Sequence, residues 1–145
     1  MDWRLEVKHD LQNYQARKVS IQNITDELAR LEAEFTGIKS ATSDSTPVSG
    51  GTNHREDRLL NNIVKRGKLE GNRRSTLEWV RIMERGLRAL NDDERFLLDR
   101  LYINGSRGAA EPLAEELGIE VRTLWYQVNK ALSKLAYAMY GQLTS

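Results

Sequence analysis

The fold of this chain is decided by residues 113–128, which read LAEELGIEVRTLWYQV. Within this stretch, Ala114 is small enough for two helices to cross closely, and Gly118 allows the positive φ that a tight turn needs. The apolar residues that lock the two helices together are Leu113, Leu117, Ile119, Leu124 and Val128. The spacing predicts a helix-turn-helix, with a short helix over about 110–117 and a long one over 120–140. A purely structural helical hairpin is the alternative.

The segment before this motif also has the marks of a helix. Asn91 and Glu94 form a capping box, in which each side chain satisfies a free backbone amide. An apolar stripe follows, made of Phe96, Leu97, Leu101 and Tyr102. Asn104-Gly105 ends that helix, and Pro112 fits the next one only in its first turn. No segment alternates with period two, so we expect an all-α fold in which a long N-terminal helix and a helical hairpin precede a C-terminal helix-turn-helix domain, residues 91–145.

The N-terminal part of the chain has apolar residues at heptad spacing. Val7, Tyr14, Ile21, Leu28 and Phe35 lie seven apart, and Ile24, Leu31 and Ile38 lie between or after them. This pattern predicts one coiled-coil-like helix over residues 1–38, interrupted in its seam by Asp10 and Arg17. The expected oligomerisation residues are Ile21, Ile24, Leu28, Leu31 and Phe35. Such a seam joins two subunits in a homodimer, or it folds back on a later helix of the same chain.

The middle of the chain is distinguished by composition and charge. Residues 39–53, KSATSDSTPVSGGTN, predict a flexible Ser/Gly-rich connector. Residues 54–90 predict a basic helical segment, because they hold ten basic and five acidic residues. A weak point and a new capping box are expected at Gly67, Gly71, Ser75 and Glu78. The positive charge is either a solvated face or a surface that contacts phosphate.

The predicted long helix, residues 120–140, separates a core face from a solvent face. Leu124, Val128, Ala131 and Leu135 fall on the core side. The outward residues are Arg122, Trp125, Tyr126, Asn129, Lys130 and Ser133. A major groove accepts an α-helix, where Arg122 could contact guanine and Asn129 adenine. The full set of DNA-binding candidates is Arg122, Thr123, Trp125, Tyr126, Asn129, Lys130, Ser106, Arg107 and Lys134. For the two aromatic residues, packing against another helix of the chain is the alternative.

From Leu90 to Leu135 the sequence resembles the promoter-reading helix-turn-helix of sigma factors. The resemblance rests on a "DERF-LL-LY" helix, on "LAEELGI" and on a reader helix that closes in "ALSKL". The whole chain is similar to small phage regulators of the ArpU and RinA type, which act on late-gene transcription. Ala109 departs from the usual Ser or Thr cap, and Trp125-Tyr126 replaces a polar or basic pair. The resemblance implies a DNA-binding regulator, with RNA polymerase as a further partner.

Composition excludes several other classes of function. The chain has 145 residues and no Cys, so it can form neither a disulfide nor a thiolate metal site. His9 and His54 are its two histidines, and neither has a second His one turn away. No catalytic grouping or phosphate loop can be assembled, so we expect no enzyme, no metal and no cofactor. No apolar stretch is long enough for a signal peptide or a membrane span, so the expected location is the cytoplasm, without membrane attachment.

The sequence therefore favours a sequence-specific DNA-binding transcription regulator, a late-gene activator encoded by a phage or prophage. Its expected partners are double-stranded DNA and a second copy of the chain. One alternative is the DNA-recognition small subunit of a phage packaging terminase, which would form a ring of about eight or more subunits. Another is a helical interaction module that binds no nucleic acid.

Overall fold

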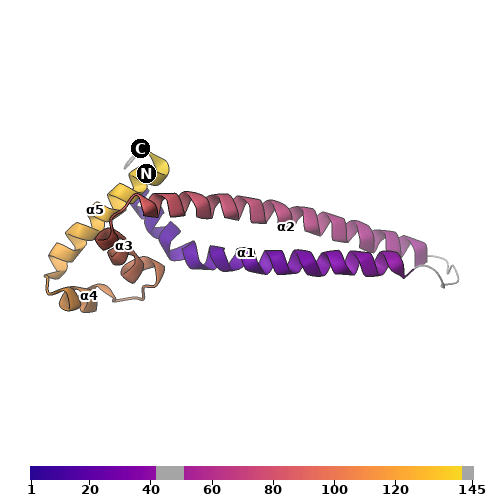
Figure 1. The fold of residues 1–145 in the computed structure, drawn as a ribbon, viewed down its shortest axis with the longest axis horizontal. Helices are drawn as coiled ribbons and strands as arrows, with labels where there is room; N and C mark the ends of the chain where they lie inside the picture. Colours follow the sequence, from indigo (N-terminus) through magenta and orange to yellow (C-terminus); the bar gives the residue numbers. More distant parts are fainter. Residues whose placement is uncertain (42–50, 142–145) are drawn as a thin grey trace. The chain divides into compact units, whose positions relative to one another are not determined.

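The computed structural model describes residues 1–41 and 51–141, and within them the chain is helical, with no β-strand (Figure 1). The elements are α1 (Trp3–Ser40), α2 (Gly51–Arg88), α3 (Asp92–Leu98), the π-helix η1 (Asp99–Ile103), α4 (Ala110–Leu117) and α5 (Val121–Tyr140). The all-α fold and the long N-terminal helix are thus confirmed. Of the predicted connector, residues 42–50 lie outside the described residues, and its two ends belong to α1 and α2.

The contacts of the chain divide it into two compact units. Residues 1–18 group with residues 78–145, whereas residues 19–77 form a unit of their own. The two long helices therefore contribute to both units. The predicted boundaries followed changes in composition, whereas this division follows contacts between residues that are distant in the sequence.

Residues 19–77 form a helical hairpin, in which α1 and α2 lie side by side (Figure 1). Leu28, Leu31 and Ile38 of the predicted seam are buried, while Ile21, Ile24 and Phe35 are half-buried. The seam is covered within a single chain, so the hairpin alternative accounts for it without a second subunit.

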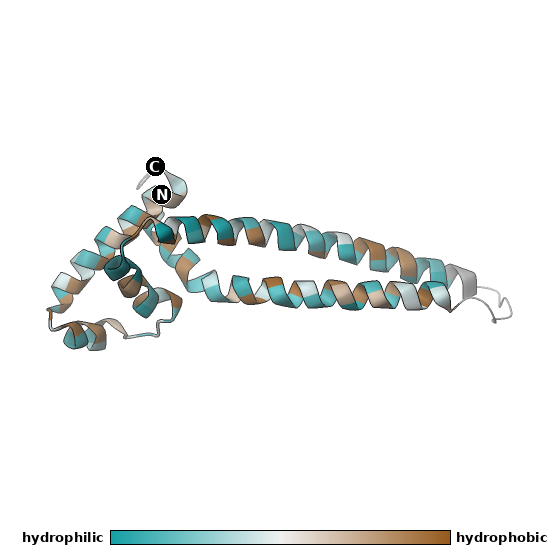
Figure 2. Ribbon diagram, viewed as in Figure 1, coloured by the Kyte–Doolittle hydropathy of each residue, from teal (hydrophilic) through white to brown (hydrophobic). Residues whose placement is uncertain are grey.

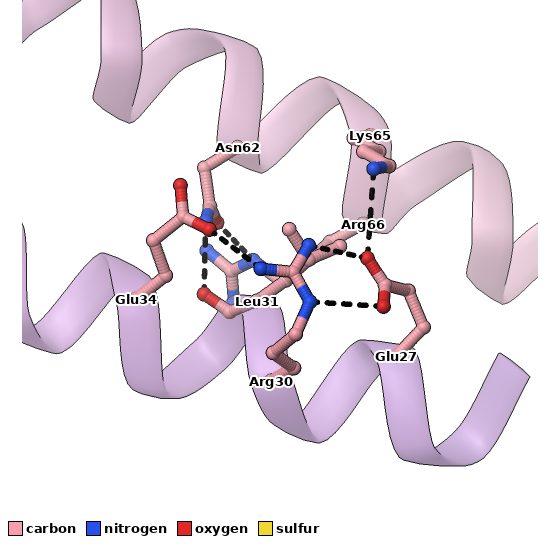
Figure 3. Close-up of polar contacts among 7 residues, drawn as sticks. All are labelled: Glu27, Arg30, Leu31, Glu34, Asn62, Lys65 and Arg66. Atoms are coloured by element: carbon pink, nitrogen blue, oxygen red, sulfur yellow. Dashed lines mark hydrogen bonds and ion pairs between the residues drawn. The ribbon is translucent and has the colours of Figure 1, made fainter.

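A buried asparagine joins the two helices of the hairpin (Figure 3). The Asn62 side-chain amide donates a hydrogen bond to the backbone carbonyl of Leu31 at 2.8 Å, although only 4% of Asn62 is exposed. Arg66 Nε donates to Asn62 Oδ1 at 2.8 Å, and the Arg66 guanidinium lies 4.8 Å from the centre of the Phe35 ring. Because a buried polar group must find its partner, this contact fixes the register of α1 against α2.

An exposed ion-pair network lies beside that asparagine (Figure 3). Arg30 pairs with Glu27 at 2.5 Å and with Glu34 at 3.2 Å, and Lys65 of α2 reaches Glu27 at 3.5 Å. Hydrogen bonding by Arg30 is the largest effect that lowers the pKa of Glu27, to about 2. Solvent screens such exposed pairs, so Asn62 contributes more to the choice of register than these charges do.

The predicted interruption of α2 is wrong, because the helix runs unbroken from Gly51 to Arg88. Gly67 and Gly71 lie inside it, and Ser75 is an interior residue rather than an N-cap. Each glycine costs a helix only about 1 kcal/mol, which packing against α1 can offset. Figure 2 shows that the central part of α2 is largely hydrophilic, so no apolar stripe signals this continuity in the sequence.

The start of α3 agrees closely with expectation. Asn91 caps the helix, with Glu94 N–H donating to Asn91 Oδ1 and Asn91 N–H donating to Glu94 Oε1, each at 2.8 Å. The predicted stripe needs one correction. Phe96 is 40% exposed, with the Arg100 guanidinium 5.4 Å from its ring centre, and the fully buried residue is Leu98.

Helix α3 continues into η1, and its end is sterically defined. The Asn104 N–H donates to the carbonyl of Asp99 at 2.8 Å, which closes a wide turn. A Cβ atom at Gly105 would lie 2.0 Å from the carbonyl oxygen of Leu101, so only glycine fits there. Asn104-Gly105 therefore ends the helix as predicted, and it directs the chain towards the loop before α4.

Candidate nucleic-acid interface

Helices α4 and α5 are joined by the predicted tight turn. Gly118 has φ +69°, in the left-handed region, and its N–H donates to Glu115 O at 3.1 Å. The Ile119 N–H donates to Ala114 O at 3.0 Å, which satisfies a second free carbonyl at the end of α4. Pro112 lies in the first turn of α4, where its missing N–H leaves no hydrogen bond unmade.

The two faces of α5 separate as the sequence predicted. The buried residues are Leu124, Val128, Ala131, Leu132, Leu135 and Ala136. Among the candidate DNA-binding residues, those exposed on α5 are Arg122, Thr123, Trp125, Tyr126, Asn129, Lys130 and Lys134. Ser133 is half-buried. The first half of α5 thus presents a continuous polar and aromatic surface to solvent.

A glycine that the sequence analysis did not single out positions the second half of α5. Gly86 of α2 is buried, and a Cβ atom there would lie 2.8 Å from Leu135 Cδ1 and 2.8 Å from Met139 Cγ. A larger residue at this position would therefore force the Leu135 and Met139 side chains of α5 to shift. In the sequence, Gly86 is simply a glycine among apolar residues spaced at helical intervals. Such a glycine fits an exposed helix position equally well, so the sequence did not indicate a packing role.

The loop before α4 brings further candidates close to Trp125. Ser106 and Arg107 are both exposed, and they line an open groove of about 580 Å³ together with Trp125, Lys8 and Tyr102. The Lys8 ammonium lies 5.7 Å from the centre of the Tyr102 ring. Sequence reasoning missed Lys8, because nothing local in α1 indicates that its first turns pack beside this loop.

The two lysines of the candidate set differ in their surroundings. Lys134 Nζ pairs with the Glu94 carboxylate at 3.0 Å, so the Lys134 charge is balanced by an ion pair within the domain. Partial burial acts to raise the pKa of Glu94, but hydrogen bonds from the Asn91 amide and from Lys134 lower it below its usual value. Lys130 lines a shallow pocket beside the same acidic helix start, together with Asp93. Arg107, Arg122 and Lys130 are exposed, and unlike Lys134 none of the three takes part in an ion pair within the described residues.

Acidic residues line the outer side of α4. Glu111 and Glu115 are exposed, whereas Glu116 pairs with Arg100 at 2.7 Å. This hydrogen-bonded pairing lowers the pKa of Glu116, so that carboxylate stays charged but is locally balanced. The outer side of α4 is therefore acidic, whereas the exposed cations lie at the start of α5 and in the Ser106–Arg107 loop.

Other kinds of site find no support in the described part of the chain. Among residues 1–41 and 51–141, no group of three or more His, Cys, Asp or Glu side chains could hold a metal ion. None of the helices described there is both long and apolar enough to span a membrane.

Comparison with known proteins gives no independent assignment: no family model, curated protein or solved structure matches the chain.

Proposed function

We propose that this protein is a sequence-specific DNA-binding transcription regulator that inserts the first half of α5 into the major groove of duplex DNA. The observation that carries the proposal is the surface of α5, whose inner side chains are buried while its outer ones remain exposed. An α-helix fits the major groove, and base edges there distinguish all four base pairs. A left-handed glycine between α4 and α5 holds the geometry that such docking requires.

The exposed side chains divide into readers and anchors. Arg122 can form two hydrogen bonds to guanine, and Asn129 can form two to adenine. Trp125 and Tyr126 offer apolar edges to a thymine methyl group or to the sugar–phosphate. The phosphate anchors are Ser106, Arg107, Thr123 and Lys130, which position the protein without reading sequence.

The biological role proposed here follows from the resemblance to small phage regulators. A regulator of late-gene transcription acts in the cytoplasm on promoter DNA, and RNA polymerase is its second partner. One reader helix contacts only a few base pairs, so we further propose a homodimer that binds two half-sites about one or more helical turns apart. The hairpin already covers Leu28 and Leu31, so the proposed dimer uses a different surface of the chain.

The test is selection of bound sequences from random duplex DNA with the full chain. The unaltered protein should enrich one motif, and the double variant Tyr126→Ala with Asn129→Ala should lose that enrichment. Tyr137→Ala is the matched control, because Tyr137 is 66% exposed on the later turns of the same helix. It should enrich the same motif as the unaltered protein. Failure of the unaltered protein to enrich any sequence would overturn the proposal.

A further inference from the structure

The hairpin has an apolar face that residues 1–41 and 51–141 leave exposed. Leu60, Ile63 and Val64 of α2 are 58%, 49% and 48% exposed. They lie three and four residues apart, so they form one stripe along the helix. Figure 2 shows hydrophobic positions in this part of α2, close to the end of the hairpin. Soluble monomers seldom expose such clusters, and apolar area of this kind marks an interaction surface.

This stripe faces away from α1. The side of α2 that meets α1 is defined by Asn62, which bonds to Leu31 O, by Arg66, which lies over the Phe35 ring, and by Arg73, which donates to Thr25 Oγ1 at 3.4 Å. The helical repeat puts Leu60 and Val64 on the opposite side from these three residues. A second helix can therefore approach the stripe without displacing α1.

Two glycines extend the same stripe by two turns. Gly67 and Gly71 follow Leu60 by seven and eleven residues, and a Cβ atom at either position would meet nothing within 4 Å. No contact within the described part of the chain therefore requires a glycine there, although glycine weakens a helix interior. A helix surface with large residues in one half and glycines in the other is complementary to its own inverted copy.

We propose that α2 pairs with α2 of a second copy of this chain, in antiparallel orientation, about a two-fold axis at the level of Lys65 and Arg66. In this register Leu60 of each copy lies over Gly71 of the other, and Val64 lies over Gly67. The large side chains fill the spaces that the glycines leave, so the two helices approach closely. The contact is isologous, as expected for a symmetric dimer.

Charge supports the antiparallel register. Asp57 lies one turn before Leu60 and Arg74 lies one turn after Gly71, and both side chains are exposed. Antiparallel pairing sets Asp57 of each copy opposite Arg74 of the other, at both ends of the interface. Parallel pairing would instead oppose like charges at both positions, and it would leave glycine facing glycine. A second copy of the chain therefore matches the stripe in shape and in charge.

The first test measures the mass of the full chain in solution, by sedimentation equilibrium at about 1 to 100 µM. A dimer is expected, and Leu60→Asp with Val64→Asp should raise its dissociation constant at least about 100-fold, since uncompensated charges would be buried. Val19→Asp is the matched control, because Val19 is an apolar residue of α1 that is also 58% exposed. It should leave the dimer intact. A protein that is monomeric throughout this range overturns the inference.

A charge exchange tests the orientation. Asp57→Arg should weaken the dimer, and adding Arg74→Asp to the same chain should restore it. Within one chain these positions are about 25 Å apart along the helix, so rescue can occur only between copies. Weakening without rescue would contradict the antiparallel register.

The absence of cysteine allows a geometric test on the same full chain. Leu60→Cys protein mixed with Gly71→Cys protein should form a mixed disulfide dimer on mild oxidation, because those positions face each other. Leu60→Cys protein alone should not, since a disulfide needs Cα atoms within about 7 Å. Efficient self-linking of Leu60→Cys would overturn the register. These readouts involve no DNA, so they fail or succeed independently of the proposed function.

Discussion

The phenol of Tyr140, the last residue of α5, donates a hydrogen bond to the buried carboxylate of Asp10, 130 positions earlier in the chain. The Trp3 ring stacks on the Tyr140 ring with a centroid separation of 4.6 Å. Burial, followed by this contact with Asp10, raises the pKa of Tyr140 far above its usual value. The first turns of α1 therefore hold the end of the helix that carries the candidate DNA-binding surface.

Removal of this phenol should destabilise the domain. Tyr140→Phe leaves the buried Asp10 carboxylate without its donor, which should lower the free energy of unfolding by about 1 to 3 kcal/mol. Tyr137→Phe, the same change at an exposed residue of α5, should stay within about 0.5 kcal/mol of the unaltered protein. Urea denaturation followed by circular dichroism measures both. Equal stability of the two variants would show that the hydrogen bond does not hold the domain together.

The turn between α4 and α5 should tolerate some side chains and not others. At Gly118 an added Cβ meets nothing within 4 Å, so any cost comes from the positive φ alone. Gly118→Val should cost about 1 to 3 kcal/mol of stability and weaken DNA binding with it. Gly118→Asn should cost less, because asparagine adopts left-handed backbone more readily. Thermal denaturation of the two variants tests this difference. An equal loss of stability in both would show that backbone strain at Gly118 is not the cause.

The stability of the hairpin should depend on the side-chain NH2 group of Asn62. Asn62→Asp replaces the donor to Leu31 O by a second acceptor, and buries a charge that Arg66 only partly offsets. A loss of about 1 to 3 kcal/mol in unfolding free energy is expected. Asn61→Asp makes the same chemical change at the exposed neighbouring position and should be nearly neutral. If both variants unfold at the same urea concentration, Asn62 does not set the register.

Local patterns in the sequence were sufficient to predict the helix-turn-helix. The capping box at Asn91, the left-handed Gly118 and the buried face of α5 each depend on residues that are near one another in the sequence. Such signals act within a turn or two of helix, so a single sequence displays them fully. The outward face of α5 followed from the same periodicity.

Contacts between distant residues could not be predicted in this way. The heptad pattern of α1 indicated a helix and a seam but not its partner, because a seam fits another subunit and a later helix equally well. Nothing in α1 marked Asp10 as a partner of Tyr140, or Lys8 as a neighbour of Arg107. Intrinsic propensity suggested a break near Gly67, which packing along the hairpin overrides.

The salt dependence of DNA binding should reflect few phosphate contacts. Arg107 and Lys130 are the positively charged phosphate anchors of the proposed interface, so log–log plots of affinity against salt should have a slope of about −2 per chain. Arg107→Ala should reduce the magnitude of that slope by about 1. Lys68→Ala, which removes an exposed charge of the hairpin, should leave it unchanged. Fluorescence anisotropy between 50 and 200 mM salt measures the slope, and a value near zero would contradict phosphate contact.

The most direct measurement of the central claim compares Arg122→Ala with Arg107→Ala on the selected DNA site and on random duplex DNA. Arg122→Ala should cost about 1 to 3 kcal/mol on the selected site, relax the preference at one base pair and change random binding little. Arg107→Ala should weaken both by the same factor, because it is assigned to phosphate. If Arg122→Ala instead loses affinity equally on selected and random DNA, then α5 does not read base sequence through Arg122, and the account is wrong.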